Sequence, residues 1–164
     1  MKYLFDFFIL CLLYIFIFYK IWKRKSKRKL FFNTIIYIYI SFVLYYTLMP
    51  IFYSLPTMFD HPYRSMNLIP FIDVKLNRGN YIKEIVLNIF MTIPFGFLFP
   101  YIINEKFKFL KTIISCFLLS LCIELLQPLL SEKRSSDITD LITNVIGGII
   151  GYSLYIIFSS KIKK

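Results

Sequence analysis

The amino-acid sequence predicts an all-α integral membrane protein with about five transmembrane helices, the N-terminus outside the cell and the C-terminus inside. Hydrophobic residues make up 58% of the 164-residue chain, and its mean hydropathy is +0.65. An average soluble protein has about 45–50% apolar residues. The apolar residues also fall into long runs with basic clusters between them. We therefore expect one membrane domain, residues 1–164, in the cell membrane.

Five apolar runs are long enough, or nearly so, to cross a hydrocarbon core, which requires about 20 helical residues. The predicted spans are residues 3–22, 30–53, 81–103, 109–130 and 138–158. Pro94 interrupts the third span, so we expect a kink there, which neighbouring helices can accommodate. The long connection of residues 54–80 is apolar around residues 66–72, which predicts that it lies along the membrane interface or dips into it.

The basic residues predict the orientation of these spans. They cluster in three segments that five spans would bring to one side, and the positive-inside rule makes that side the cytoplasm. The net charge of +11 is then explained by topology and by contact with anionic headgroups, so we expect no nucleic-acid partner. The clusters are Lys20, Lys23, Arg24, Lys25, Lys27, Arg28 and Lys29, then Lys106, Lys108 and Lys111, then Lys161, Lys163 and Lys164.

Polar residues form a stripe on each of the last three spans. Ionisable groups inside a membrane are costly and usually face a protein interior or a cavity. At about 1.5 Å of rise per residue, most of these groups lie within roughly 10–12 Å of the predicted outer surface. We therefore predict that three helices converge on one outer-leaflet pocket, with Arg134 as its counter-charge. The stripes are Glu84, Asn88 and Thr92, then Cys116, Ser120, Glu124 and Gln127, then Asp137, Asp140 and Asn144.

A purely structural role is the alternative for these residues. A Glu124–Arg134 ion pair and a hydrogen bond between Asn88 and Asn144 would each stabilise helix packing, typically by under about 2 kcal/mol. The Gly147-xxx-Gly151 pattern, with Gly148 beside it, favours close helix packing. For single residues the structural role is favoured, but the clustering of the set at one depth favours a site.

The remaining polar and sulfur-containing residues predict no further site. His61 is expected to be an exposed interfacial residue, and Asp60 and Asp73 are expected to be solvated loop charges. The three cysteines lie inside apolar runs, and no Cys/His cluster has zinc-ligand spacing. No cofactor is evident.

Motifs in the second half of the chain resemble the VanZ-like family, named for a membrane protein associated with resistance to the glycopeptide teicoplanin. Residues 67–71 read NLIPF, and residues 88–98 resemble the pattern N-x-x-x-F-x-P-F-G-x-L. Thr92 and Ile93 fill positions that we expect to be more uniformly apolar, and the hydroxyl group of Thr92 departs from that expectation. ELLQ follows at residues 124–127, and the element R-x-x-D-x-x-D-x-x-x-N-x-x-G-G-x-x-G is complete from Arg134 to Gly151. The resemblance covers about residues 67–151, whereas residues 1–53 add two spans without a motif.

The resemblance implies a cell-envelope role at the outer face of a Gram-positive bacterium and lowered susceptibility to glycopeptides, but it supplies no reaction. Our leading hypothesis is a non-enzymatic protein that recognises a lipid-linked cell-wall precursor or teicoplanin itself, with membrane lipids as further partners. Arg134 would donate to a phosphate or carboxylate. The candidate ligand-binding residues are Asn67, Asn88, Glu124, Gln127, Arg134, Asp137, Asp140 and Asn144.

Two alternatives belong to other functional classes. A membrane enzyme acting on a phospholipid or polyprenyl phosphate would use Glu124, Asp137 and Asp140 as general acid and base, or as oxygen ligands of a hard cation. Against it, the chain has no HExxH motif and no nucleophile–histidine arrangement. A transporter is favoured least, because the chain lacks inverted repeats and its polar groups lie at one end. The sequence leaves the natural ligand, any metal and the oligomeric state open.

Overall fold

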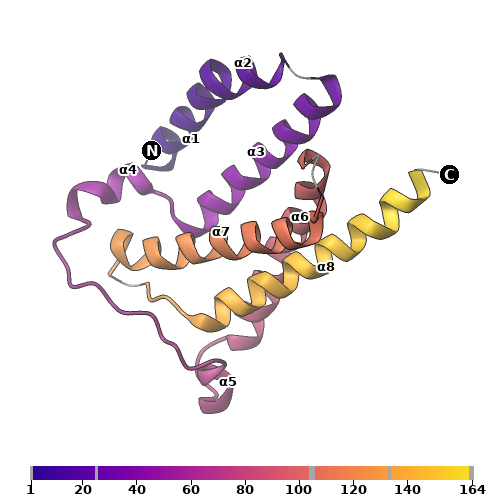
Figure 1. Ribbon diagram of the computed structural model, residues 1–164. Coiled ribbons are helices and arrows are strands. Elements are labelled where there is room, and N and C mark those ends of the chain that lie inside the picture. The colour runs from indigo at the N-terminus through magenta and orange to yellow at the C-terminus, as the bar shows by residue number, and fades with distance from the viewer. Residues whose placement is uncertain (1, 25, 104–105, 133, 163–164) are drawn as a thin grey trace.

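The computed structural model describes residues 2–24, 26–103, 106–132 and 134–162, and all regular elements in these ranges are helical (Figure 1). A π-helical stretch, Tyr14–Phe18, joins the first two helices, and a 3₁₀ turn, Leu55–Thr57, follows the fourth. The α-helices are α1 (Lys2–Leu13), α2 (Tyr19–Trp22), α3 (Lys27–Thr47), α4 (Ile51–Ser54), α5 (Ile72–Leu76), α6 (Tyr81–Ile102), α7 (Lys108–Leu130) and α8 (Ile138–Ile162).

Five segments within the described ranges are long and apolar enough to cross a membrane, which confirms the predicted all-helical class and its number of spans. They are Lys2–Trp22, Lys27–Thr57, Tyr81–Ile102, Lys108–Leu130 and Ile138–Ser160. Helix α6 continues through Pro94 and Pro100, and the kink expected at Pro94 stays a prediction.

The second predicted span, residues 30–53, lies within the candidate span Lys27–Thr57, but its helix is interrupted. Helix α3 ends at Thr47, and a short helix, α4, begins again after Pro50. Proline has no backbone N–H to continue the hydrogen-bond ladder, so a helix rarely runs through it undisturbed. Asp6 of α1, only 2% exposed, accepts hydrogen bonds from Ile51 N at 2.7 Å and Phe52 N at 3.2 Å. This carboxylate caps the start of α4 and fixes α1 to the bend.

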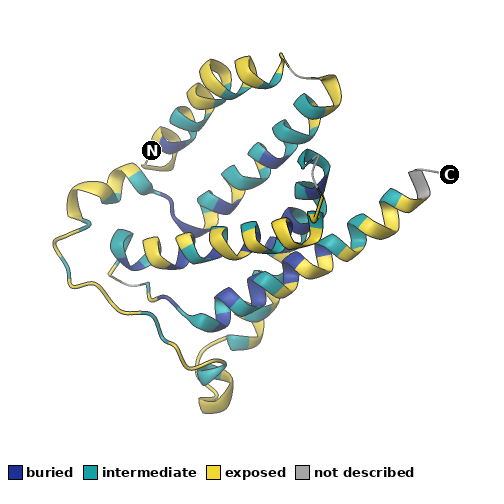
Figure 2. Cartoon of the chain, viewed as in Figure 1, coloured by how far each residue is buried: buried dark blue, intermediate teal, exposed yellow. Residues whose placement is uncertain are grey.

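Helices α6 and α8 cross with their backbones almost in contact, and glycines make the crossing possible. A Cβ atom at Gly151 would lie 2.1 Å from the Ile93 carbonyl oxygen, and one at Gly96 would lie 2.1 Å from the Gly148 carbonyl oxygen. Helix α7 covers the same region of α8 (Figure 1), and Figure 2 shows the buried residues gathered on the facing sides of α6, α7 and α8. These three helices form the core that carries the polar stripes.

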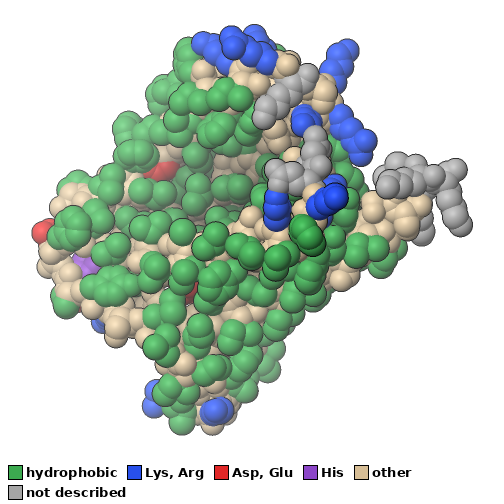
Figure 3. Space-filling model, in the orientation of Figure 1, with side chains coloured by type: hydrophobic (Ala, Val, Ile, Leu, Met, Phe, Trp, Pro, Cys, Tyr) green, Lys and Arg blue, Asp and Glu red, His purple; other side chains and the backbone are tan. Residues whose placement is uncertain are grey.

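The basic residues gather mainly at one end of the bundle, over the α2–α3 and α6–α7 connections (Figure 3). Their common position agrees with the predicted clusters, although Lys25, Lys163 and Lys164 lie outside the described residues, as does the side chain of Lys161. The opposite end also carries basic residues, among them Lys75 in α5. The orientation of the bundle in the membrane therefore stays a prediction.

Candidate functional site

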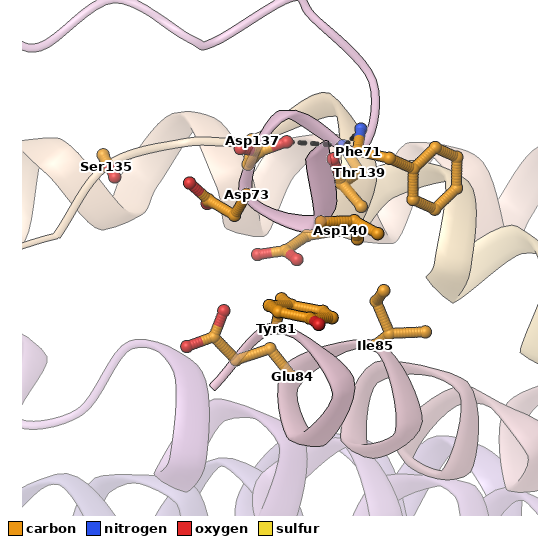
Figure 4. A pocket seen from close by; sticks show the side chains of 10 residues that line it. Phe71, Asp73, Tyr81, Glu84, Ile85, Ser135, Asp137, Thr139 and Asp140 are labelled. Atoms are coloured by element: carbon orange, nitrogen blue, oxygen red, sulfur yellow. Dashed lines mark hydrogen bonds between the residues drawn. The ribbon is translucent and has the colours of Figure 1, made fainter. Parts of the chain in front are cut away.

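A pocket of about 220 Å³ (Figure 4) lies beside α5, at the end of the bundle opposite the α2–α3 connection (Figure 1). It is formed by α5, the first turns of α6 and the start of α8, so the long connection of residues 54–80 folds back onto the helical core. We call it the acidic pocket. It is lined by Phe71, Asp73, Val74, Tyr81, Glu84, Ile85, Ser135, Asp137, Thr139 and Asp140.

All charged residues that line the acidic pocket are carboxylates. Asp73 comes from α5, Glu84 from α6, Asp137 from the residue before α8 and Asp140 from its first turn. Among the residues that the structure describes, no lysine or arginine joins them in the lining. Figure 4 shows the Asp73, Glu84 and Asp140 carboxylates around the same open space. Uncompensated charges of one sign in a cleft with low-dielectric walls focus the electric field. The pocket is therefore suited to a cationic group.

Asp137 holds the pocket together. Its Oδ1 accepts a hydrogen bond from Thr139 N at 2.7 Å, which caps the start of α8. Its Oδ2 accepts one from Asn67 Nδ2 at 2.8 Å. Two backbone hydrogen bonds of 3.0 Å, from Asn67 N to Ser136 O and from Ile138 N to Asn67 O, complete a β-bridge. Both oxygens of Asp137 are thus occupied, and the residue anchors the long connection to the helical core.

Asp140 joins the polar stripes of α6 and α8. Its Oδ1 accepts a hydrogen bond from Asn88 Nδ2 at 2.7 Å. One turn deeper, Thr92 Oγ1 donates to the Asn144 carbonyl oxygen at 2.7 Å. The described part of the chain provides no hydrogen-bond partner for Asp140 Oδ2, nor for the side-chain oxygens of Asp73 and Glu84. Three carboxylates from three helices are therefore free to accept hydrogen bonds from a ligand.

Glu124 lies behind the pocket and does not line it. The residue is 3% exposed, and its Oε2 accepts a hydrogen bond from Asp137 N at 3.0 Å, while Ser136 Oγ donates to its backbone oxygen. These hydrogen bonds connect α7 to the residues that precede α8. The predicted counter-charge is elsewhere: Arg134 forms no ion pair with Glu124 and lines another hollow beside Tyr3 and Met49.

Asn144 is also buried behind the pocket, at 2% exposure. The Asn88–Asn144 hydrogen bond of the alternative structural role is not formed: Asn88 donates to Asp140, and Asn144 Nδ2 donates to Ser120 Oγ at 2.8 Å. Asn144 Oδ1 is buried without a partner among the described residues. Gln127 lies farther away, where its Nε2 is 3.5 Å from the Thr47 carbonyl oxygen in a mainly apolar groove that also includes Asn88.

The structure therefore brings together four of the predicted ligand-binding residues, Asn67, Asn88, Asp137 and Asp140, at or beside the pocket. It also adds Asp73, which the sequence had suggested to be a solvated loop charge. Asp73 directly follows the apolar segment 66–72, which was the available signal in the sequence. Backbone hydrogen bonds from Asn67 to Ser136 and from Phe71 to Thr139 Oγ1 hold this segment against the start of α8. Within the described ranges, no three His, Cys, Asp or Glu side chains are arranged to hold a metal ion.

His61 also differs from its expected role as an exposed interfacial residue. It is half-buried, and its Nδ1 is buried without a hydrogen-bond partner in the part of the chain that the structure describes. It does not line the acidic pocket, so it adds nothing to that site.

Comparison with known proteins extends these observations. A family profile described as VanZ/LLP1 matches residues 5–159. Over 121 residues the chain is 34% identical to "Protein VanZ" from Enterococcus faecium, an alignment that covers 72% of this chain and 69% of that protein. No solved structure matches the chain. The profile includes the first two spans, in which the sequence motifs were absent.

Proposed function

The chain belongs to the VanZ/LLP1 family, and on that premise we propose that it binds an amine-bearing headgroup in the acidic pocket and lowers susceptibility to glycopeptides such as teicoplanin. It is a membrane protein with five candidate spans. In the predicted orientation the acidic pocket opens at the outer leaflet. A lipid-linked cell-wall precursor and the lipoglycopeptide itself are the ligands considered, because each joins a polar head to a membrane-soluble chain.

The observation that carries this proposal is a set of three carboxylates in one small pocket, each with at least one side-chain oxygen that has no hydrogen-bond partner among the described residues. A primary ammonium group offers three N–H donors and no acceptor. Asp73, Glu84 and Asp140 supply acceptors from three different helices. Charge-assisted hydrogen bonds of this kind are about twice as strong as neutral ones. The volume of about 220 Å³ suits a headgroup and is below the roughly 300–1,000 Å³ of pockets that enclose a drug-sized molecule.

The alternative of a lipid-phosphate enzyme receives less support from the same geometry. It required Glu124, Asp137 and Asp140 as acid and base. The Glu124 carboxylate is buried and does not line the pocket, and both oxygens of Asp137 accept hydrogen bonds within the chain. An acidic pocket also repels a phosphate. Of these three residues, only Asp140 keeps a carboxylate oxygen beside the pocket without a hydrogen-bond partner in the described part of the chain.

Expression in a susceptible Gram-positive host tests the proposed function. The wild type, Asp140→Asn, Glu84→Gln and the control Lys83→Gln are compared at matched membrane levels. Lys83 is exposed and precedes Glu84 on α6 without lining the pocket. We expect the inhibitory concentration of teicoplanin to rise with the wild type and the control and to return toward the empty-vector value with both pocket variants. Vancomycin, which lacks the acyl chain, serves as the parallel drug.

Two results would count against the proposal. No rise with well-expressed wild type would remove the resistance role. A rise that both pocket variants retain in full would remove the acidic pocket from it. Asp140→Asn keeps an oxygen that can accept from Asn88, so this variant tests the charge while preserving the contact between α6 and α8.

A further inference from the structure

A second hollow, of about 620 Å³, lies between the start of α1, the α3–α4 bend and the end of α7. We call it the basic hollow. Its charged lining residues, Lys2 and Arg134, are both cations, in contrast to the acidic pocket. Arg134 and Ser135 are neighbours in the chain, yet Arg134 lines the basic hollow and Ser135 lines the acidic pocket. The connection from α7 to α8 therefore lies between two sites of opposite charge.

Neither cation of the basic hollow has an acidic partner in the described part of the chain. Asp6 lies one helical turn from Lys2 on α1, but its two oxygens accept the backbone hydrogen bonds that cap α4. Lys2 Nζ lies 3.9 Å from the centroid of the Tyr53 ring, and Arg134 is half-buried. Lys2 is exposed, so of the two cations only Arg134 is partly buried. A partly buried cation without an acidic partner is stabilised by a bound anion, and the hollow is therefore suited to one.

The remaining lining identifies the kind of anion. A guanidinium group presents a planar fork that matches the oxygens of a phosphate, and a lysine ammonium adds a second positive charge. Tyr3 and Tyr53 also line the hollow, and tyrosines are enriched where a protein meets the headgroup layer of a bilayer. Apolar residues such as Met49 and Leu130 complete the lining. The hollow thus combines phosphate donors with the surroundings of a lipid headgroup.

We propose that the basic hollow is a binding site for the phosphate of an anionic membrane phospholipid, with Arg134 and Lys2 as its ligand-contacting cations. This site is separate from the amine-binding pocket and takes ligands of the opposite charge. It also gives Arg134 a phosphate-binding role without Glu124.

Native mass spectrometry of the full chain, released from detergent with added lipid, tests this site. The probes are phosphatidylglycerol and diacylglycerol, which differ by the phosphate-containing headgroup, and soluble glycerol phosphate as the competing source of phosphate. The variants are Arg134→Gln, Arg134→Lys and Lys2→Gln. Arg78→Gln is the control, since Arg78 is exposed and lines neither site.

We expect the wild type and Arg78→Gln to retain phosphatidylglycerol in preference to diacylglycerol. Loss of a charge-assisted contact should weaken retention by about tenfold in Arg134→Gln and by less in Arg134→Lys and Lys2→Gln. Arg134→Lys keeps the charge and serves as the folded reference if the glutamine variant is unstable. Glycerol phosphate should not displace the lipid, because it lacks the chains that hold the headgroup at the membrane.

Three outcomes would overturn the inference. They are equal retention of the two lipids by the wild type, unchanged retention by Arg134→Gln, or displacement of the lipid by glycerol phosphate, which would make the hollow a site for soluble phosphate. Asp140→Asn separates this proposal from the proposed function. It removes a charge of the acidic pocket and should leave phosphatidylglycerol retention unchanged.

Discussion

Replacement of Gly151 by alanine tests the crossing of α6 and α8, on which the position of every pocket residue depends. The new Cβ atom would lie 2.1 Å from Ile93 O, 2.9 Å from Phe97 N and 3.0 Å from the Gly96 Cα atom. All three are backbone atoms, and an ordinary carbon–oxygen contact is about 3.3 Å. The helices must therefore separate by more than about 1 Å or strain their backbones. Overpacking of this kind costs about 1–3 kcal/mol, and we expect the upper end.

Gly148→Ala is the matched control on the same helix. Its Cβ atom would first meet Cys116 Sγ, at 2.8 Å, and a side chain can move where a backbone cannot. We expect a loss of about 1 kcal/mol, relieved by the second substitution Cys116→Ala. Unfolding of the purified protein in detergent, followed by circular dichroism, measures the free energy of unfolding for each variant.

Whether Gly151→Ala raises or lowers the free energy of unfolding distinguishes the two possibilities. In a helix with open space around it, alanine is favoured over glycine by about 1 kcal/mol, so Gly151→Ala would stabilise the protein if the helices did not cross there. A Gly151→Ala variant that is as stable as the wild type, or no less stable than Gly148→Ala, would refute the crossing.

Three further predictions address the elements around the core. Asp6→Ala should lower the free energy of unfolding by about 1–2 kcal/mol, because it removes the cap of α4, whereas Asp6→Asn, which keeps one acceptor, should lose less in the same assay. Asn67→Ala should speed hydrogen exchange of the backbone amide at Ile138, which donates to Asn67 O, while exchange within α8 stays slow; equal acceleration throughout α8 would contradict this local role. For the orientation, a cysteine at Ser135 in a cysteine-free background should react with an impermeant maleimide in intact cells, and one at Ser26 should not; the reverse would place the acidic pocket in the cytoplasm.

The five long helices could be predicted from sequence because each depends on local composition. An apolar run of about 20 residues between charged segments gives the same result wherever the other helices lie. The second predicted span, residues 30–53, lies within the candidate span Lys27–Thr57, and the break in its helix before Pro50 is a feature that the apolar run does not reveal. Asp6 was missed as well, although an ionisable residue in an apolar span was the signal applied to the other helices.

Helical periodicity places Asn88 and Asp140 on the polar stripes of α6 and α8, and the structure brings these two residues into contact. Which side chains of α6 and α8 meet depends on how the two helices are shifted and rotated relative to each other. The glycine crossing sets this arrangement, and local sequence patterns do not reveal it. Asn88 therefore bonds to Asp140 and not to Asn144. The side chain of Arg134 lines the basic hollow and does not meet Glu124, because its position depends on the path of the connection between α7 and α8.

The central claim is that the acidic pocket holds an ammonium group, and a binding comparison tests it directly. Teicoplanin and its N-acetylated derivative are titrated against the full chain in nanodiscs, with the wild type, Glu84→Gln and Asp140→Asn. We predict that acetylation weakens binding to the wild type by about tenfold or more, as expected for the loss of charge-assisted hydrogen bonds, and that this difference shrinks in both variants. Wild-type binding that is indifferent to acetylation, or a difference that both variants retain in full, would contradict the account.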